Sequence, residues 1–215
     1  MELTVGSLFT GVGGLDLGLE QAGLKTVWQV EFDEWCRERL AENFPHTEKF
    51  KDVREVGKHN LKSVDVVCGG FPCQDISSAK LDAKGLAGER SGLWFEYKRI
   101  ICELRPRYVL IENVAALLVR GLDRVLSDLA SIGYDAEWQT LRASAFGLPT
   151  RRKRLFIIAY PNGFGLEKSM FQKSVNKSDT FKFGAFDRVF VGDLGRSDEC
   201  FSYRGLDNPY SLLVN

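Results

Sequence analysis

The sequence has no excess of charge of either sign: its 215 residues hold 29 Lys and Arg against 29 Asp and Glu. A neutral chain can attract nucleic acid only through a local basic patch or through another part of an assembly. Long apolar runs are also lacking, and none approaches the length of a membrane-spanning helix. The first residues carry no basic segment followed by an apolar run, so no signal peptide is indicated. We therefore expect a cytoplasmic protein.

Paired cysteines are missing as well. The chain has five cysteines, and no two have the CxxC spacing of metal or redox motifs. A chain of this length can bury a real core without disulfides, so a reducing compartment fits best. Internal repeats and low-complexity runs are absent too. The cysteines are Cys36, Cys68, Cys73, Cys102 and Cys200.

What is present is an alternation of short apolar strands with amphipathic segments. Strands are predicted at 3–9, 26–30, 64–68, 108–111, 134–141 and 155–160, and helices at 15–22, 34–43, 93–104 and 122–132. This order predicts an α/β fold with a mainly parallel sheet flanked by helices. We expect one domain over residues 1–160, and a tail over 161–215 to which no structure can be assigned. Residues 71–92 are expected to form a long loop, and loops of this length in compact domains are usually functional or disordered.

The first motif is Phe9-Thr-Gly-Val-Gly-Gly14, between a strand and a helix. Glycines in such a turn let the backbone approach a ligand, and the helix N-terminus offers free amide donors. Glu31 and Asp52 follow the next strands, where carboxylates can hold a ribose. The pattern predicts a nucleotide-like ligand, although a nicotinamide enzyme would fit it almost as well and Glu31 could be a simple surface charge.

The second motif is Cys68-Gly-Gly-Phe-Pro-Cys-Gln74. Cys68 lies inside an apolar strand and is expected to be a buried structural cysteine. Cys73 instead stands among Gly, Pro and polar residues at the mouth of the sheet. On spacing alone it could be either a nucleophile, provided that its thiol can ionise, or a structural cysteine.

Two further motifs lie next to predicted strands, and Glu112 is expected at the same edge of the sheet as Cys73 if both strands are parallel. Glu112, in Ile111-Glu-Asn-Val114, ends a buried strand, where a carboxyl group can protonate or hydrogen-bond a bound ring or simply cap the next helix. Thr150-Arg-Arg-Lys-Arg-Leu155 places four basic residues ahead of an apolar strand. Such a run is either a phosphate or base contact or a solvated edge.

Together, in this order, the four motifs resemble those of the DNA (cytosine-5-)-methyltransferase family, and the match covers most of residues 3–160. The resemblance implies a Rossmann-like S-adenosylmethionine-dependent methyltransferase fold that acts on double-stranded DNA. Glu31 would then bind the ribose hydroxyls, Phe32 would stack on the adenine, and Asp52 would accept a hydrogen bond from the adenine amino group. The other expected cofactor contacts are Phe9, Gly11, Gly13, Gly14, Val53 and Leu93.

The resemblance also implies the chemistry. Cys73 would attack carbon 6 of a cytosine that has been flipped out of the duplex, and Glu112 would hold ring nitrogen 3. Arg154 would contact the base carbonyl, and Arg152 would support the cysteine and its loop. Residues 75–91 would close over DNA, with strand contacts from Ser77, Ser78, Lys80 and Lys84.

The sequence departs from the family in two places. Thr150 stands where the family's basic motif usually has Gln, which affects a backbone-supporting contact. Residues 161–215 are too short for a usual target-recognition domain, and the family's final Asn-containing motif is not visible. The chain could be half of a split enzyme with a second polypeptide, a truncated and inactive relic, or a reduced enzyme. In the first two cases we expect the isolated chain to bind cofactor weakly and DNA poorly.

Two other functions remain as alternatives. A non-catalytic subunit that binds DNA or a partner would not need Cys73, Glu112, Arg152 and Arg154 together. A nicotinamide oxidoreductase would have no use for Phe-Pro-Cys-Gln combined with Glu-Asn-Val.

Overall fold

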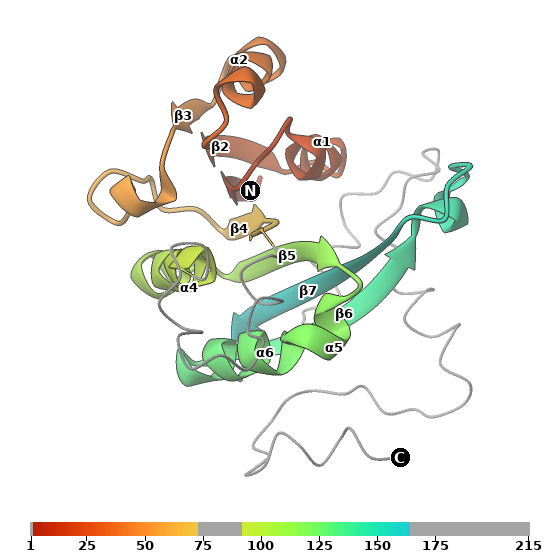
Figure 1. The fold of residues 1–215 in the computed structure, drawn as a ribbon. Coiled ribbons are helices and arrows are strands. Elements are labelled where there is room, and N and C mark those ends of the chain that lie inside the picture. The colour runs from red at the N-terminus through yellow and green to blue at the C-terminus, as the bar shows by residue number, and fades with distance from the viewer. Residues whose placement is uncertain (1, 73–91, 164–215) are drawn as a thin grey trace, which may run out of the picture.

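The computed structural model describes residues 2–72 and 92–163, which form one seven-stranded sheet with helices on both faces (Figure 1). The strand order is β3-β2-β1-β4-β5-β7-β6. The strands are β1 (Thr4–Leu8), β2 (Lys25–Val30), β3 (Glu48–Phe50), β4 (Val66–Gly69), β5 (Tyr108–Val114), β6 (Tyr134–Arg142) and β7 (Lys153–Pro161). The helices are α1 (Gly14–Gln21), α2 (Glu34–Asn43), α4 (Gly92–Leu104), α5 (Leu117–Arg120) and α6 (Leu122–Ser131), with short 3₁₀ turns η1 (Val53–Glu55) and η2 (Ala143–Phe146).

The first five strands in the sheet order pair in parallel, and β7 is antiparallel to both of its neighbours. β1 pairs in parallel with both β2 and β4, and β4 pairs in parallel with β5. β7 runs antiparallel to β5 and β6. The predicted α/β class with a mainly parallel sheet is therefore confirmed. Because β1, β2, β4 and β5 pair in parallel, their carboxyl ends lie along one edge of the sheet. The strand order changes direction between β1 and β4, which is where ligands bind in such sheets.

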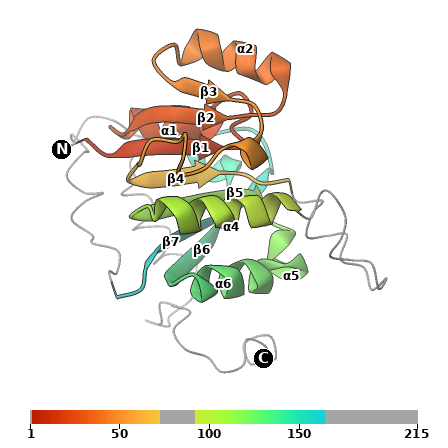
Figure 2. The ribbon, with the colours of Figure 1, turned by 90° about the vertical axis from the view of Figure 1, so that its left-hand side faces the viewer.

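Alternating side chains of the central strands build two cores, one on each face. Val67, Val109 and Ile111 face α4 and α6 in the larger cluster. Val66 and Leu110 instead pack with residues of α1 on the opposite face. Figure 2 shows α4 and α6 in front of the sheet, in the view that places α1 behind it. Strands buried on both faces explain the continuous apolar runs in the sequence.

Most predicted elements occur within a residue or two of their expected bounds. Asp33 caps α2, because its carboxylate accepts a hydrogen bond from the Cys36 amide at 2.9 Å. β5 continues three residues beyond the predicted end at Ile111, since β7 pairs with it as far as Val114. The short elements β3 and α5 were not expected. In the described ranges, no helix is both long and apolar enough to cross a bilayer.

Candidate active site

The glycine turn after β1 has an unusual backbone. Phe9 has a φ of 53°, and Gly11 and Gly13 have φ values of 58° and 86°. A bulky residue in the left-handed region is uncommon and costs free energy, so surrounding contacts must hold it there. The Phe9 ring stacks on Tyr97 of α4, with ring centroids 6.1 Å apart. The turn is further tied to β2, because the Thr10 amide donates to the Val30 carbonyl at 3.2 Å.

Glu31 joins this turn to the end of β2. One carboxylate oxygen accepts from the Gly11 amide at 2.7 Å, and the other accepts from the Asp33 amide at 2.9 Å. A carboxylate has about four acceptor positions, so both oxygens can still accept from another donor. The structure thus brings Glu31 and the glycine turn together, as the sequence predicted.

The glycine turn borders open space. A Cβ built on Gly11 or Gly14 would meet no atom within 4 Å, whereas one on Gly13 would collide with the Phe44 ring at 2.4 Å. Phe32, next to Glu31, is 63% exposed, which is unusual for a large aromatic side chain. An exposed ring beside a carboxylate and an open glycine backbone is the set of groups that a nucleoside needs. The residues present therefore fit an adenosine-containing cofactor.

Asp52 and Val53 lie at the start of η1. Val53 is buried, while the Asp52 carboxylate caps η1 through the Arg54 amide at 2.9 Å. The Arg54 guanidinium also contacts it, with Nη2 2.6 Å from Oδ2. These hydrogen bonds from Arg54 lower the pKa of Asp52. Asp52 is thus an ionised acceptor in the predicted place, but Arg54 occupies it in this structure.

Leu93, the last predicted cofactor contact, lies in the first turn of α4. It is partly buried and packs against the larger core cluster. Among the predicted cofactor residues, Val53 belongs to the larger core cluster, and Leu93 and Phe9 pack against it.

Glu112 and Arg154 form an ion pair across β5 and β7. Arg154 Nε lies 2.8 Å from Glu112 Oε1, and both side chains are about a quarter exposed, at 28% and 26%. The pair follows from the antiparallel register, which sets Arg154 opposite Val114, on the same face as Glu112 two residues away. Two residues that the sequence analysis singled out independently are therefore joined by the fold.

Gly70 lies directly against Glu112. A Cβ on Gly70 would stand 2.8 Å from Glu112 Oε2 and 3.2 Å from the Glu112 carbonyl oxygen. Only glycine gives the carboxylate this room. Because Gly70 is three positions before Cys73, Glu112 contacts the chain as it enters the predicted nucleophile segment. Cys73 itself, and the loop contacts predicted at Ser77, Ser78, Lys80 and Lys84, lie outside the described residues.

Asn113 fixes the backbone at the same point. Its Nδ2 donates to the Phe71 carbonyl at 3.0 Å, and both residues are buried. The Phe71 ring packs on Trp94 of α4, with centroids 5.1 Å apart. Trp94 Nε1 in turn donates to Asp128 of α6 at 2.9 Å. The chain ahead of Pro72 is therefore held by a backbone hydrogen bond and by a supported aromatic pair.

The basic motif begins in the connection between β6 and β7 and continues into β7, which starts at Lys153. Arg152 is exposed, its amide donates to Thr150 Oγ1 at 3.3 Å, and its carbonyl accepts from the Ala143 amide at 2.9 Å. Thr150 thus makes a backbone contact within the motif. The Arg152 guanidinium shows no contact with Glu112 or Gly70 in the described part of the chain.

A buried polar network joins α1, β1 and β2 next to the glycine turn. Asp16 accepts from Ser7 Oγ at 2.9 Å and from Gln29 Nε2 at 2.8 Å, which ties α1 to β1 and β2. Burial raises the pKa of Asp16 above its usual value. Cys68 is fully buried nearby, and burial raises the pKa of its thiol strongly. A thiol of this kind is inert, so the structural role predicted for Cys68 is confirmed.

Several supporting residues were missed from the sequence. Gly70 and Asn113 stand inside motifs already noted, and their adjacency to Cys73 and Glu112 was the available signal. Trp94, Tyr97 and Arg99 gave no local signal, because a helix rich in aromatic and charged residues is ordinary.

Among the described residues, no group of His, Cys, Asp or Glu is arranged to hold a metal ion.

Comparison with known proteins gives a consistent result. The family model for C-5 cytosine-specific DNA methylase matches residues 3–194. The Type II methyltransferase M2.BsuMI of Bacillus subtilis is 38% identical over 73% of this chain and 42% of its own length. The Type II methyltransferase M.HhaI of Haemophilus parahaemolyticus is 30% identical over 97% of this chain and 61% of its own. The chain thus spans about half the length of the curated relatives it matches.

Solved structures agree on the fold. A putative DNA modification methyltransferase encoded within an E. coli prophage superposes with a TM-score of 0.61 at 31% identity, covering 74% of this chain and 47% of that one. A DNMT2 mutant of Spodoptera frugiperda superposes with a TM-score of 0.64 at 21% identity, over 76% and 51%. At that lower identity the likeness shows the fold alone. The family match over most of the chain, together with the joined Glu112 and Arg154 on a methyltransferase-like sheet, shows that this chain belongs to the C-5 cytosine-specific DNA methylase family.

Proposed function

We propose that the chain transfers a methyl group from S-adenosylmethionine to carbon 5 of cytosine in DNA, through a covalent adduct with Cys73. The observation that carries this proposal is the Glu112–Arg154 pair, packed on Gly70 just ahead of Cys73. A carboxyl group and a guanidinium side by side match the ring nitrogen and adjacent carbonyl of cytosine, which are also side by side. A nicotinamide enzyme has no use for this pair.

The cofactor would lie along the open glycine turn. Gly11 and Gly14 offer an uncovered backbone, Glu31 has free acceptor positions for ribose hydroxyls, and the exposed Phe32 ring offers a face for the adenine. When bound, S-adenosylmethionine supplies an electrophilic methyl group on a sulfonium. Asp52 becomes available for the adenine amino group once Arg54, itself an exposed side chain, moves aside.

The chemistry then follows from the residue types. The Cys73 thiolate adds to carbon 6, forming a carbon–sulfur bond and moving the electron pair of the 5,6 double bond to carbon 5. Glu112 hydrogen-bonds ring nitrogen 3 and, with Arg154 on the base carbonyl, stabilises the charge that builds up on the ring. Once carbon 5 has taken the methyl group and left the sulfonium as a neutral thioether, loss of the carbon-5 proton to solvent would restore the double bond and expel Cys73 as a thiolate. Cysteine suits both the attack and the departure.

Double-stranded DNA is the proposed substrate, with the basic run that includes Arg151 and Lys153 as the proposed phosphate contact and Arg152 as the proposed support of Cys73 and its loop. Because the chain is neutral overall and spans about half of its relatives' length, we propose that a second polypeptide or segment supplies target recognition. The proposed location is cytoplasmic.

Two measurements test the proposal. In calorimetry, the chain should bind S-adenosylmethionine, weakly when alone, and should not bind NAD. In a tritiated-methyl assay, the label should appear on cytosine in duplex DNA, slowly with the isolated chain and not at all with Cys73→Ser. Binding of NAD without S-adenosylmethionine would refute the proposal, and transfer that persists in Cys73→Ser would refute the covalent route. Fast, robust methylation by the chain alone would refute the need for a second component.

A further inference from the structure

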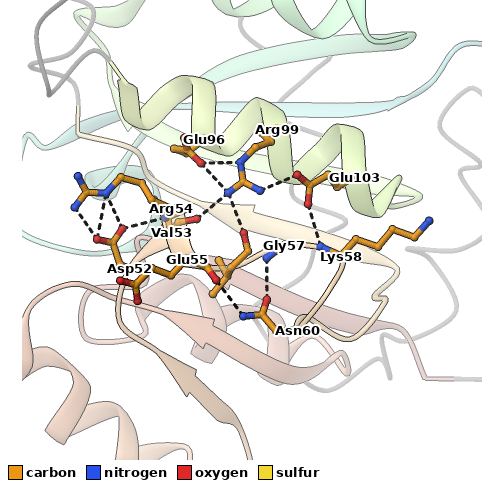
Figure 3. Close-up of polar contacts among 11 residues, drawn as sticks. Asp52, Val53, Arg54, Glu55, Gly57, Lys58, Asn60, Glu96, Arg99 and Glu103 are labelled. Atoms are coloured by element: carbon orange, nitrogen blue, oxygen red, sulfur yellow. Dashed lines mark hydrogen bonds and ion pairs between the residues drawn. The ribbon is translucent and has the colours of Figure 1, made fainter.

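Arg99, near the middle of α4, reaches the segment that begins with η1. Its Nη2 donates to the Val53 carbonyl at 3.0 Å and to the Val56 carbonyl at 2.9 Å (Figure 3). One guanidinium nitrogen therefore holds both ends of the turn that starts at Asp52. These contacts join positions more than forty residues apart, and no local turn requires them.

Two carboxylates of the same helix fix the guanidinium itself. Arg99 Nε donates to Glu96 at 2.7 Å, and Nη1 donates to Glu103 at 2.8 Å. Glu103 also accepts from the Lys58 amide at 2.9 Å, so it binds the far side of the same segment. The side chain of Arg99 is 32% exposed, which leaves the pairs only partly screened by water. A guanidinium with all three nitrogens engaged has little freedom to rotate.

The same helix contacts the other side of the open glycine turn. Tyr97, two residues before Arg99, stacks on Phe9 and donates to the Leu110 carbonyl at 3.3 Å. α4 therefore sets the position of η1 relative to the turn after β1. The two segments proposed to bind the cofactor are otherwise carried on different strands.

We propose that Arg99 is a positioning residue that holds Asp52 and Val53 in place for recognition of the adenine of S-adenosylmethionine. This inference rests on the proposed function, since it assumes that η1 binds the adenine. Arg99 does not itself touch the cofactor; it acts through two backbone carbonyls. Lysine cannot replace it, because one ammonium lacks the fork that engages two carbonyls and two carboxylates at once.

The first test needs no cofactor. Hydrogen exchange at the Glu55 and Gly57 amides, followed by NMR on the whole chain, should accelerate about tenfold or more in Arg99→Lys. The matched control is Arg39→Lys, where a helical arginine is paired with Glu42 at 2.9 Å and is similarly exposed. That control should leave the two amides unchanged. Unchanged exchange in Arg99→Lys would overturn the inference, whatever the chain binds.

The second test measures binding of S-adenosylhomocysteine by calorimetry. Arg99→Lys should weaken binding about tenfold, and Arg39→Lys should not. In an Asp52→Ala background the added loss from Arg99→Lys should be clearly smaller, because the two residues act on the same contact. Full-size losses in both backgrounds, or unchanged affinity in Arg99→Lys, would overturn this inference alone. No binding by the unaltered chain would instead overturn the proposed function, and this inference with it.

Discussion

The two halves of the site are built differently. Around β4, β5 and β7, the side chains are locked: Glu112 is pressed against Gly70 and paired with Arg154, and Asn113 holds the Phe71 carbonyl. Around β1, β2 and η1, the backbone is fixed and most of the groups proposed to face the cofactor are open, with Asp52, paired to Arg54, as the exception. There the glycine turn borders empty space, and Phe32 is largely exposed.

The difference fits the roles proposed for the two halves. Groups that stabilise a changing charge have to be in place before the reaction, so their rotamers are fixed by packing and hydrogen bonds. Groups that bind and release a cofactor must leave room for it, so only their backbones are fixed. Substitutions in the first half should therefore affect stability and catalysis together, whereas those in the second should affect binding alone.

The largest effect is expected for Glu112→Gln. The amide can hydrogen-bond ring nitrogen 3 but cannot transfer a proton to it as a carboxyl group can, and it leaves Arg154 without its counter-charge. Single-turnover methyl transfer should fall roughly 10²–10⁴-fold. Glu137→Gln is the control, since the Glu137 carboxylate on β6 accepts a hydrogen bond from the Tyr160 hydroxyl at 2.7 Å and has no part in the proposed chemistry. A loss of less than about threefold in Glu112→Gln would show that the carboxyl group has no part in the chemistry.

Gly70→Ala should affect both properties. The new methyl group would lie 3.2 Å from a backbone carbonyl that cannot rotate away, as well as displacing the carboxylate. Thermal denaturation should show a loss of about 1–3 kcal/mol, with reduced methyl transfer. Gly18→Ala, in the exposed part of α1 where a Cβ meets nothing within 4 Å, should be neutral or slightly stabilising. Equal stability of the two variants would mean that Glu112 is not confined.

Asp128→Asn tests the support of Phe71 through Trp94. Burial of Asp128 raises its pKa, but hydrogen bonds from Lys98, Trp94 and Arg124 outweigh this and lower the pKa below 3.8. The stabilisation is therefore present above the unfolded-state pKa and is lost as pH falls through the folded-state pKa.

The variant should lose about 1–3 kcal/mol at pH 7, and the gap to the unaltered chain should narrow in acid below about pH 4. Urea denaturation at several pH values measures this. Asp123→Asn, on the exposed face of the same helix, should change stability by only a few tenths of a kcal/mol. A gap that is independent of pH would contradict the ionised state assigned to Asp128.

Phe32→Ala should have the smallest effect on folding. The ring is already 63% exposed, so the free energy of unfolding should change by less than about 0.5 kcal/mol. Affinity for S-adenosylhomocysteine should nevertheless fall about three- to tenfold, since the adenine would lose an aromatic face. A variant that loses stability but keeps its affinity for S-adenosylhomocysteine would contradict the expectation that substitutions in this half affect binding alone.

The sequence predicted those features of the fold that depend on residues close together along the chain. The Asp33 cap of α2 and the glycine turn before α1 depend on neighbouring residues, and both occur as expected. β5 ends later than predicted because its last three residues pair with β7, and β7 comes about forty residues later in the sequence. The three-residue β3 is too short for its pattern to be distinctive.

In the candidate site, too, the features set by neighbouring residues were predicted and those set by distant residues were not. The position of Glu31 follows from the end of β2, which the sequence marks clearly, whereas Glu112 lies inside β5 and not at its predicted end. The contact between Asn113 and Phe71, and that between Arg99 and η1, join residues more than forty positions apart, so no spacing rule predicts them. The pairing of Arg54 with Asp52 depends on a side-chain rotamer rather than on the sequence pattern.

The most direct test of the account is a trapping experiment on duplex DNA that carries 5-fluorocytosine at many sites. Fluorine at carbon 5 cannot leave as a proton does, so a methylated adduct stays on Cys73 and accumulates even when DNA binding is weak. With S-adenosylmethionine, we predict a covalent protein–DNA species that is absent in Cys73→Ser and strongly reduced in Glu112→Gln. An adduct that survives Cys73→Ser, or none from the folded, cofactor-binding chain, would contradict the account.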